Sequence, residues 1–180
     1  MKTNEQVIEQ TKKWINDVVI GCNFCPFAAR EMKLNSIHYE VENSNDISEC
    51  LYRFVNECVR LDDNKNIETS FLILPNAFQK FADYLDLVSL AEKLLKKQDY
   101  TGIYQVAGFH PLYCFADAAI DDASNYTNRS PYPMLHLLRE ERIEQALLHY
   151  PNPEQIPERN IAFARKAGLI YMKTLRENCF

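Results

Sequence analysis

Side chains able to bind or react are concentrated in the segment 121–133. Its sequence, Asp-Asp-Ala-Ser-Asn-Tyr-Thr-Asn-Arg-Ser-Pro-Tyr-Pro, supplies carboxylates, amides, hydroxyls and a guanidinium within one stretch. Asn, Asp, Ser and Pro are typical of loops, because their side chains bond to nearby backbone or their dihedrals suit turns. Functional side chains often lie on loops that a rigid scaffold holds. We therefore expect the functional site to include this loop and the residues that follow it as far as Glu140.

The guanidinium of Arg129 is the principal candidate for binding an anionic substrate. Arginine binds carboxylate and phosphate groups through two parallel hydrogen bonds, and amides and prolines surround it in this loop. Asn128, Ser130 and Arg139 are candidates to assist it, so the expected partner is a small anionic molecule. The alternative is that Arg129 holds its own loop in place by donating to backbone carbonyls.

Cys25, His110 and Asp122 are the candidates for catalysis. Cys25 begins a Cys-Pro-Phe segment, and His110 lies in a Phe-His-Pro segment at the expected end of a strand. An imidazole can activate a thiol that is mostly protonated at neutral pH, which makes nucleophilic attack by Cys25 one mechanism. Each residue also has a structural alternative: a buried thiol, a histidine bonded to backbone at a turn, and an aspartate that caps or turns the chain.

A zinc site is the competing mechanism. Cys25, His110 and His136 could supply three ligands and leave the fourth position open for water, as in catalytic zinc centres. His136 is expected on the first turn of a helix, with Arg139 on the same face, and a capping or packing role is its alternative. Zinc is the one cofactor that the sequence suggests, because its four glycines form neither a dinucleotide-binding nor a phosphate-binding loop.

Size and charge restrict the class of protein. A chain of 180 residues with 47% hydrophobic residues suits one folded domain, so we expect residues 1–180 to form a single domain. The net charge of −5 argues against a nucleic-acid or anionic-membrane binder, which would carry a basic face. Neither a secretory signal nor a run of about 18 apolar residues is present, which predicts a cytoplasmic protein without a membrane segment. The oligomeric state does not follow from the sequence.

Hydrophobic periodicity and turn residues predict alternating helices and strands. Gly21 is expected to end the first helix in the left-handed conformation, and Asp46 or Ser44 to cap the second. The strand that Pro75 closes is apolar, which predicts burial on both faces. In chain order the expected elements are a helix over 5–20, a strand over 36–41, a helix over 47–61, a strand over 69–74, a helix over 77–97, a strand over 103–109, and helices over 135–149 and from 153.

This order predicts an α/β fold in which a small sheet is built as β-α-β-α-β, with flanking helices and a C-terminal helical segment. Parallel pairing through right-handed crossovers is the expected arrangement, and an antiparallel α+β sheet is the alternative. Ligands of open parallel sheets bind off the carboxyl ends of the strands. Those ends lie at Pro75 and Pro111, and the polar loop leaves from the second. The topology and the loop chemistry therefore indicate the same edge of the sheet.

Three long stretches of the sequence match one protein family. They read Val-Val-Ile-Gly-Cys-Asn-Phe-Cys-Pro-Phe-Ala over 18–28, Gln-Val-Ala-Gly-Phe-His-Pro over 105–111, and Asn-Tyr-Thr-Asn-Arg-Ser-Pro-Tyr-Pro over 125–133. On these motifs the chain resembles, along nearly all of its length, the bacterial domain-of-unknown-function family 1415. The family has no established activity, so the resemblance implies membership rather than a mechanism. The family carries an apolar residue where this chain has Cys22, which disfavours a redox pair with Cys25.

Two classes of function remain open. The first is a small-molecule enzyme whose site combines the Cys-Pro-Phe segment, the Phe-His-Pro strand end and the 121–140 loop. It would act by a thiol nucleophile or by zinc-assisted hydrolysis or transfer on an anionic substrate. The second is a non-catalytic module that binds a ligand or a protein partner through the polar loop. Both mechanisms of the first class require Cys25 to lie beside His110.

Overall fold

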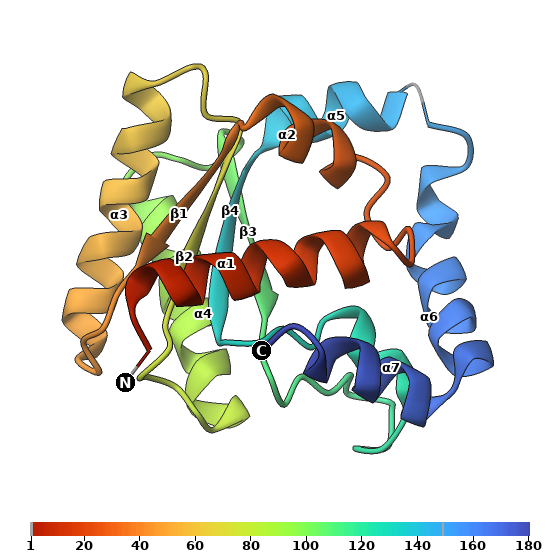
Figure 1. The fold of residues 1–180 in the computed structure, drawn as a ribbon. Helices are drawn as coiled ribbons and strands as arrows, with labels where there is room; N and C mark the ends of the chain where they lie inside the picture. Colours follow the sequence, from red (N-terminus) through yellow and green to blue (C-terminus); the bar gives the residue numbers. More distant parts are fainter. Residues whose placement is uncertain (1, 149) are drawn as a thin grey trace.

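A mixed sheet lies at the centre of the molecule (Figure 1). The computed structural model of the chain describes residues 2–148 and 150–180. Its strands are β1 (Ile37–Val41), β2 (Thr69–Ile73), β3 (Tyr104–Phe109) and β4 (Met134–Arg139). β1 pairs in parallel with β2, while β4 lies antiparallel between β2 and β3. Consequently β1, β2 and β3 run in one direction, and their carboxyl ends meet at one edge of the sheet.

Helices cover both faces of this sheet. In Figure 1, α1 crosses one face, and α3 and α4 lie on the other side of the strands. The helices are α1 (Asn4–Trp14), α2 (Ala28–Leu34), α3 (Ile47–Asp63), α4 (Phe81–Lys97), α5 (Glu140–Leu148), α6 (Ile156–Ala167) and α7 (Leu169–Glu177), with a π-helical segment η1 (Ile15–Ile20) and the short 3-10 helices η2 (Ala123–Thr127) and η3 (Pro153–Gln155). No helix within the described residues is long and apolar enough to cross a membrane.

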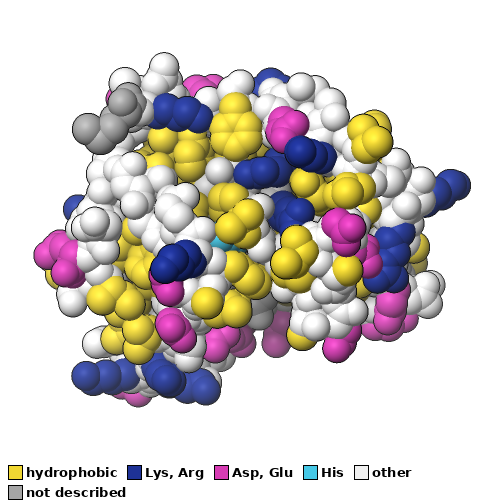
Figure 2. Space-filling view, turned by 90° about the horizontal axis from the view of Figure 1, so that it is seen from below, with side chains coloured by type: hydrophobic (Ala, Val, Ile, Leu, Met, Phe, Trp, Pro, Cys, Tyr) yellow, Lys and Arg dark blue, Asp and Glu magenta, His cyan; other side chains and the backbone are white. Residues whose placement is uncertain are grey.

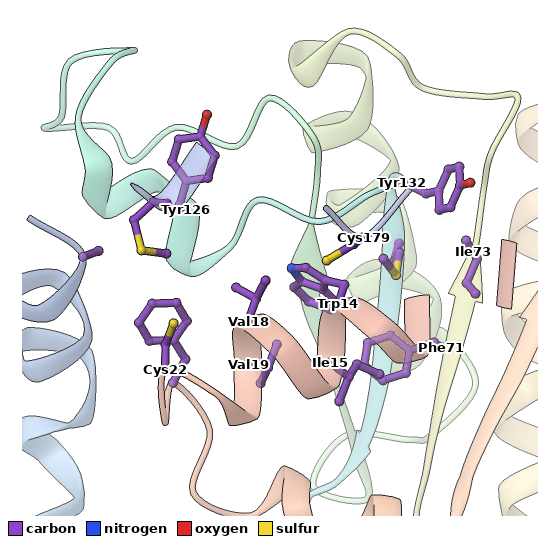
Figure 3. Packing of buried hydrophobic residues seen from close by; sticks show 14 of the residues in the cluster. Trp14, Ile15, Val18, Val19, Cys22, Phe71, Ile73, Tyr126, Tyr132 and Cys179 are labelled. Carbon is purple, nitrogen blue, oxygen red and sulfur yellow. The ribbon is translucent and has the colours of Figure 1, made fainter. Parts of the chain in front are cut away.

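Two hydrophobic cores form because successive strand residues point to opposite faces of the sheet. On the α1 face, Trp14 and Ile15 share a core with Phe71 and Ile73 of β2, and Figure 3 shows this packing. On the other face, Leu72 belongs to a core that α3 and α4 complete. Every residue of β2 is buried, so the predicted burial of this strand on both faces is confirmed.

The predicted α/β fold and its β-α-β-α-β order are confirmed. The three strands of that order run parallel to one another as predicted, but the sheet is mixed because β4 is inserted between β2 and β3. Asp46 caps α3: its carboxylate accepts hydrogen bonds from the backbone N–H groups of Ser48 (2.7 Å) and Glu49 (3.1 Å). This cap ends the connection from β1 and directs α3 across the sheet.

The predicted helix over 135–149 is wrong for its first five residues. Met134–Arg139 is strand β4, and the helix α5 begins at Glu140; residue 149 lies outside the described residues. The error has a physical reason. A short apolar run that is buried between two neighbouring strands has no alternation, so periodicity cannot distinguish it from a buried helix. His136 and Arg139 are therefore strand residues.

The first helical stretch ends before Gly21 as predicted, but the predicted left-handed conformation of Gly21 is wrong, and the final helix is not continuous. Gly21 has a right-handed conformation (φ −59°), and the left-handed residue is Asn23 (φ 54°). A glycine is required at position 21 for another reason, because a Cβ there would overlap the backbone oxygen of Asp17. The single final helix is divided into α6 and α7 by Gly168, whose φ of 88° strains any residue with a side chain.

Candidate functional site

The polar loop lies at the carboxyl edge of the sheet, as predicted. The backbone N–H of His110, just after β3, donates to Asn128 O (3.2 Å), and Leu74, just after β2, donates to Pro133 O (2.9 Å). The indole of Trp14 donates to Arg129 O (3.1 Å). These bonds join the loop to two strand ends and to α1. The loop is thus held by the sheet and by the α1 core.

Arg129 is 9% exposed and holds its own loop. Its Nε donates to Tyr113 O (2.9 Å) and its Nη2 to Ile120 O (2.7 Å). The guanidinium lies over the ring of Tyr126, 4.8 Å from the centroid. These contacts match the alternative role of Arg129, in which it holds its own loop in place by donating to backbone carbonyls. Nη1 donates to no described residue.

A second guanidinium, that of Arg176 on α7, lies close to the first. Its Nε donates to Ser130 O (3.0 Å). Burial lowers the pKa of Arg176 below its ordinary value, while the Tyr126 hydroxyl raises that pKa and the positive charge of Arg129 lowers it again. Arginine stays charged at neutral pH despite such shifts. The loop and α7 therefore place two cationic groups around Tyr126.

Lys2 extends this group at the surface. Its Nζ lies 4.7 Å from the ring centroid of Phe180, and the guanidinium of Arg176 lies 5.4 Å from the same ring. Lys2 donates to Gln10 Oε1 (2.9 Å) and to the hydroxyl of Tyr132 (3.1 Å). We call Lys2, Arg129 and Arg176 the basic cluster. Figure 2 views the molecule from below, the side on which α7 lies, and shows Lys and Arg side chains gathered there among hydrophobic ones.

No described carboxylate forms a close ion pair with the basic cluster, although the charge of Glu177 raises the pKa of Arg176. Within residues 2–148 and 150–180, no Asp or Glu oxygen lies within 4 Å of Lys2 Nζ or of the two guanidiniums. A cavity of about 220 Å³ adjoins the cluster at Lys2. Its wall consists of Lys2, Val7, Asn43, Pro75, Asn76 and Tyr132. The carboxyl edge thus combines net positive charge with room for a small ligand.

His110 is fully buried and both of its ring nitrogens have backbone partners. Nδ1 accepts from the N–H of Leu112 (2.9 Å), so the ring proton is on Nε2, which donates to Phe78 O (2.8 Å). Burial lowers the pKa of His110 and favours this neutral form. These contacts match the structural alternative, a histidine bonded to backbone at a turn. They leave no ring nitrogen for a thiol or a metal.

Cys25 is partly exposed and has no histidine partner among residues 2–148 and 150–180. Burial raises the pKa of its thiol, although the backbone N–H groups of Phe27 and Ala28 lower it in part. Among the described residues no hydrogen bond joins its sulfur to an imidazole, and Cys25 and Cys22 are both free thiols. The protonated thiol is the favoured form, so a thiolate nucleophile has no support from these contacts.

Asp122 fastens the loop to α6. Its carboxylate accepts from the N–H of Ser124 (2.8 Å), which caps η2, and from Arg165 Nη2 (2.8 Å). The Arg165 guanidinium, followed by the Ser124 hydrogen bonds, holds the pKa of Asp122 well below its usual range. This is the capping alternative. Asn128 and Ser130 are also engaged within the loop, since Asn128 Oδ1 accepts from a neighbouring threonine and Ser130 Oγ donates to backbone.

His136 and Arg139 lie away from the basic cluster because β4 runs toward the opposite edge. Arg139 donates to Leu61 O (2.6 Å) and Ile67 O (3.0 Å) there. His136 stacks on Phe71, with ring centroids 3.8 Å apart, and its Nε2 lies 2.6 Å from Thr69 Oγ1. Burial lowers the pKa of His136 to about 3. Both side chains stabilise the sheet at these positions.

The predicted zinc ligands are not brought together. In the part of the chain that the structure describes, one group of three His, Cys, Asp or Glu residues has ligand atoms within 4.8 Å of one another, and it consists of His38, Glu40 and Glu57. Cys25 and the two histidines predicted with it do not form such a group. The physical reason is that both ring nitrogens of His110, just after β3, bond to backbone, while His136 lies inside β4.

Sequence reasoning missed Lys2 and Arg176. Neither lies in a motif, and each reaches the loop only through tertiary packing of α7 and the segment before α1. One feature of the sequence could have indicated Arg176. It lies four residues after Met172 and three before Cys179, two apolar residues that the structure shows to be fully buried. A guanidinium beside such residues is partly buried and needs a partner.

Comparison with known proteins yields one family. The family model described as protein of unknown function, DUF1415, matches residues 6–174. No curated protein and no solved structure matches the chain.

Proposed function

The chain belongs to the DUF1415 family, which is described without a function, and from the geometry of its basic cluster we propose that it binds a small anionic molecule. The ligand class is a phosphate-bearing or polycarboxylate metabolite, held at the carboxyl edge of the sheet. The observation that carries the proposal is the absence of any carboxylate within 4 Å of Lys2, Arg129 and Arg176 among the described residues.

Positive charge that is partly buried and has no close ion pair supports an anionic ligand. Removing a cation from water is costly unless a counter-charge and hydrogen bonds replace the solvent. Backbone carbonyls give Arg129 and Arg176 hydrogen bonds but no net negative charge. Carboxylates are not scarce, because the chain has 25 Asp and Glu residues and a net charge of −5. A bound anion would supply the missing charge, and guanidinium groups suit phosphate and carboxylate geometry.

Binding without catalysis is the function that these groups support best. The thiol mechanism requires a base beside Cys25, and the zinc mechanism requires converging ligands. The contacts of His110 with Phe78 and Leu112 support neither. Nucleophilic chemistry at Cys25 stays a prediction from the sequence alone.

Calorimetric titration with inorganic phosphate, pyrophosphate and citrate tests the proposal. Arg176→Gln is expected to weaken binding of the best of the three by about tenfold to a hundredfold, because a hydrogen bond to a charged group is worth ~1.5–3 kcal/mol. Arg142→Gln is the matched control, since it removes the same charge from an exposed arginine that pairs with Glu68 (3.5 Å). Equal losses in both variants, or no binding by the natural chain at about 1 mM ligand, would contradict the proposal.

A further inference from the structure

A second cluster of polar side chains lies on the face of the sheet opposite α1, between β1 and α3. His38 and Glu40 are alternate residues of β1 and point to the same side, while Glu57 projects from α3 and is 1% exposed. His38 Nε2 lies 3.5 Å from Glu40 Oε2 and 3.6 Å from Glu57 Oε2. Three atoms that carry lone pairs therefore converge on one point.

Neighbouring side chains orient the two carboxylates toward that point. Ser70 Oγ donates to Glu57 Oε2 (2.5 Å), and Arg60 Nε donates to Glu57 Oε1 (3.0 Å). Arg53 Nη1 lies 3.8 Å from Glu40 Oε1. Glu57 thus has Oε1 toward Arg60 and Oε2 toward the imidazole, while Glu40 has Oε1 toward Arg53 and its imidazole-facing Oε2 also lies 3.5 Å from Arg60 Nη2. Such outer contacts fix metal-binding carboxylates in known centres.

We propose that His38, Glu40 and Glu57 bind a divalent transition-metal ion. Ligand atoms at about 2.0–2.2 Å from a tetrahedral metal lie roughly 3.4 Å apart, close to the 3.5 and 3.6 Å found around His38 Nε2. One imidazole with two carboxylates suits zinc, manganese or iron(II), whereas calcium and magnesium prefer oxygen ligands alone. The fourth position faces solvent, since the His38 and Glu40 side chains are 26% and 22% exposed.

The charged side chains around His38 carry a net negative charge, which favours a bound cation. Glu40, Glu42 and Glu57 contribute three negative charges, and Arg53 and Arg60 contribute two positive ones. With His38 neutral, one negative charge is uncompensated. A divalent metal ion with a bound hydroxide would balance it. Metal binding competes with Arg60, which lies 3.5 Å from Glu40 Oε2.

Cobalt(II) titration of chelator-treated protein distinguishes a metal site from an ion-pair network that binds no metal. We expect one equivalent of Co²⁺ with a visible d–d spectrum and no sulfur-to-cobalt charge-transfer band, since none of the free cysteines belongs to the group. His38→Ala and Glu40→Gln should each weaken binding about tenfold or more. Glu49→Gln is the matched control, because it removes an exposed carboxylate from α3, the helix that carries Glu57.

His38→Ala and Glu40→Gln are chosen because a loss of metal binding in them should not result from unfolding. His38 and Glu40 are partly exposed, so their replacement should leave the circular dichroism spectrum and cooperative unfolding intact, whereas removal of the buried Glu57 carboxylate could unfold the chain. No saturable Co²⁺ binding up to about 1 mM, or equal binding by both variants and the natural chain, overturns the proposal and leaves an ion-pair network only. Phosphate binding should be unchanged in His38→Ala, which keeps this site distinct from the basic cluster.

Discussion

The hydroxyl of Tyr84 fills a space that only a glycine leaves open. Tyr84 is buried and donates to Met134 O (2.7 Å), which joins α4 to the start of β4. A Cβ on Gly108 would lie 2.7 Å from that hydroxyl, while the nearest ring carbons would be at an ordinary 3.5 Å. The hydroxyl alone therefore excludes a side chain from this position of β3.

Gly108→Ala should lower the free energy of unfolding by about 1–3 kcal/mol, because displaced Tyr84 loses its bond and a buried carbonyl loses its donor. In a Tyr84→Phe background the same change should cost much less, since the clashing atom is absent. Urea denaturation of the four chains of this cycle measures the coupling. Costs that add within experimental error would show that the hydroxyl is not the constraint.

At the scale of single residues, the sequence indicated where the site lies more reliably than what each side chain does. Arg129 and His110 were placed at the correct edge of the sheet by their positions after β3. Their partners are backbone carbonyls and N–H groups of Tyr113, Ile120, Phe78 and Leu112. Which backbone group meets a side chain depends on loop geometry, and residue types do not encode that geometry.

At the scale of elements, capping residues and prolines made some boundaries predictable. Asp46 starts α3 because its carboxylate accepts two backbone N–H groups, a local interaction that the sequence displays. Pro75 follows β2 closely, and Thr69–Ile73 is rich in β-formers. Pro133 comes directly before β4, but the end of this strand has no such signal, because Met-Leu-His-Leu-Leu-Arg continues into Glu140 without Gly or Pro. Its identity as a strand comes from its neighbours.

The ion pair between η2 and α6 should make loop stability depend on pH. Asp122→Asn keeps a good capping residue but removes the charge that Arg165 binds. We expect a loss of about 0.5–1 kcal/mol at pH 7, modest because Arg165 is exposed. The pKa of Asp122 is depressed in the folded chain, so its contribution is complete above the unfolded pKa and declines as pH falls.

Urea unfolding at pH 7 and at about pH 3 measures this dependence, since the unfolded carboxyl titrates near pH 4. The gap between the natural chain and Asp122→Asn should narrow at the lower pH. Asp121→Asn is the matched control, because Asp121 is exposed and forms no ion pair with any residue that the structure describes; it should change stability by less than about 0.5 kcal/mol. A gap that widens in acid would refute the ion-pair account.

At the scale of the whole molecule, α6 and α7 complete the α1 core. Ala164, Met172 and Cys179 are each 0% exposed and belong to the same core as Trp14. Figure 3 shows Cys179 beside Trp14. The C-terminal helices are therefore part of the hydrophobic core that also supports the loop, and they carry Arg176 to the basic cluster. Size and composition predicted a single domain and the order of elements predicted an α/β fold, but neither could predict this long-range packing.

Met172→Ala should lower the free energy of unfolding by about 2–5 kcal/mol, the usual cost of a cavity at a fully buried position. Ile170→Ala on the same helix is the matched control, because Ile170 is 84% exposed, and its effect should stay within about 0.5 kcal/mol. Chemical denaturation monitored by Trp14 fluorescence reports directly on the shared core. A small effect of Met172→Ala would mean that α7 is docked without contributing to that core.

The position of β4 determines when the sheet can close during synthesis. While the ribosome has released the chain only up to Pro133, β1 and β2 can pair, but β3 has no strand beside it and β2 keeps one open edge, because β4 lies between them. Pairing of strands distant along the chain is slow, and an open edge can accept a strand from another molecule. The nascent chain is therefore most exposed to aggregation just before Met134–Arg139 emerges.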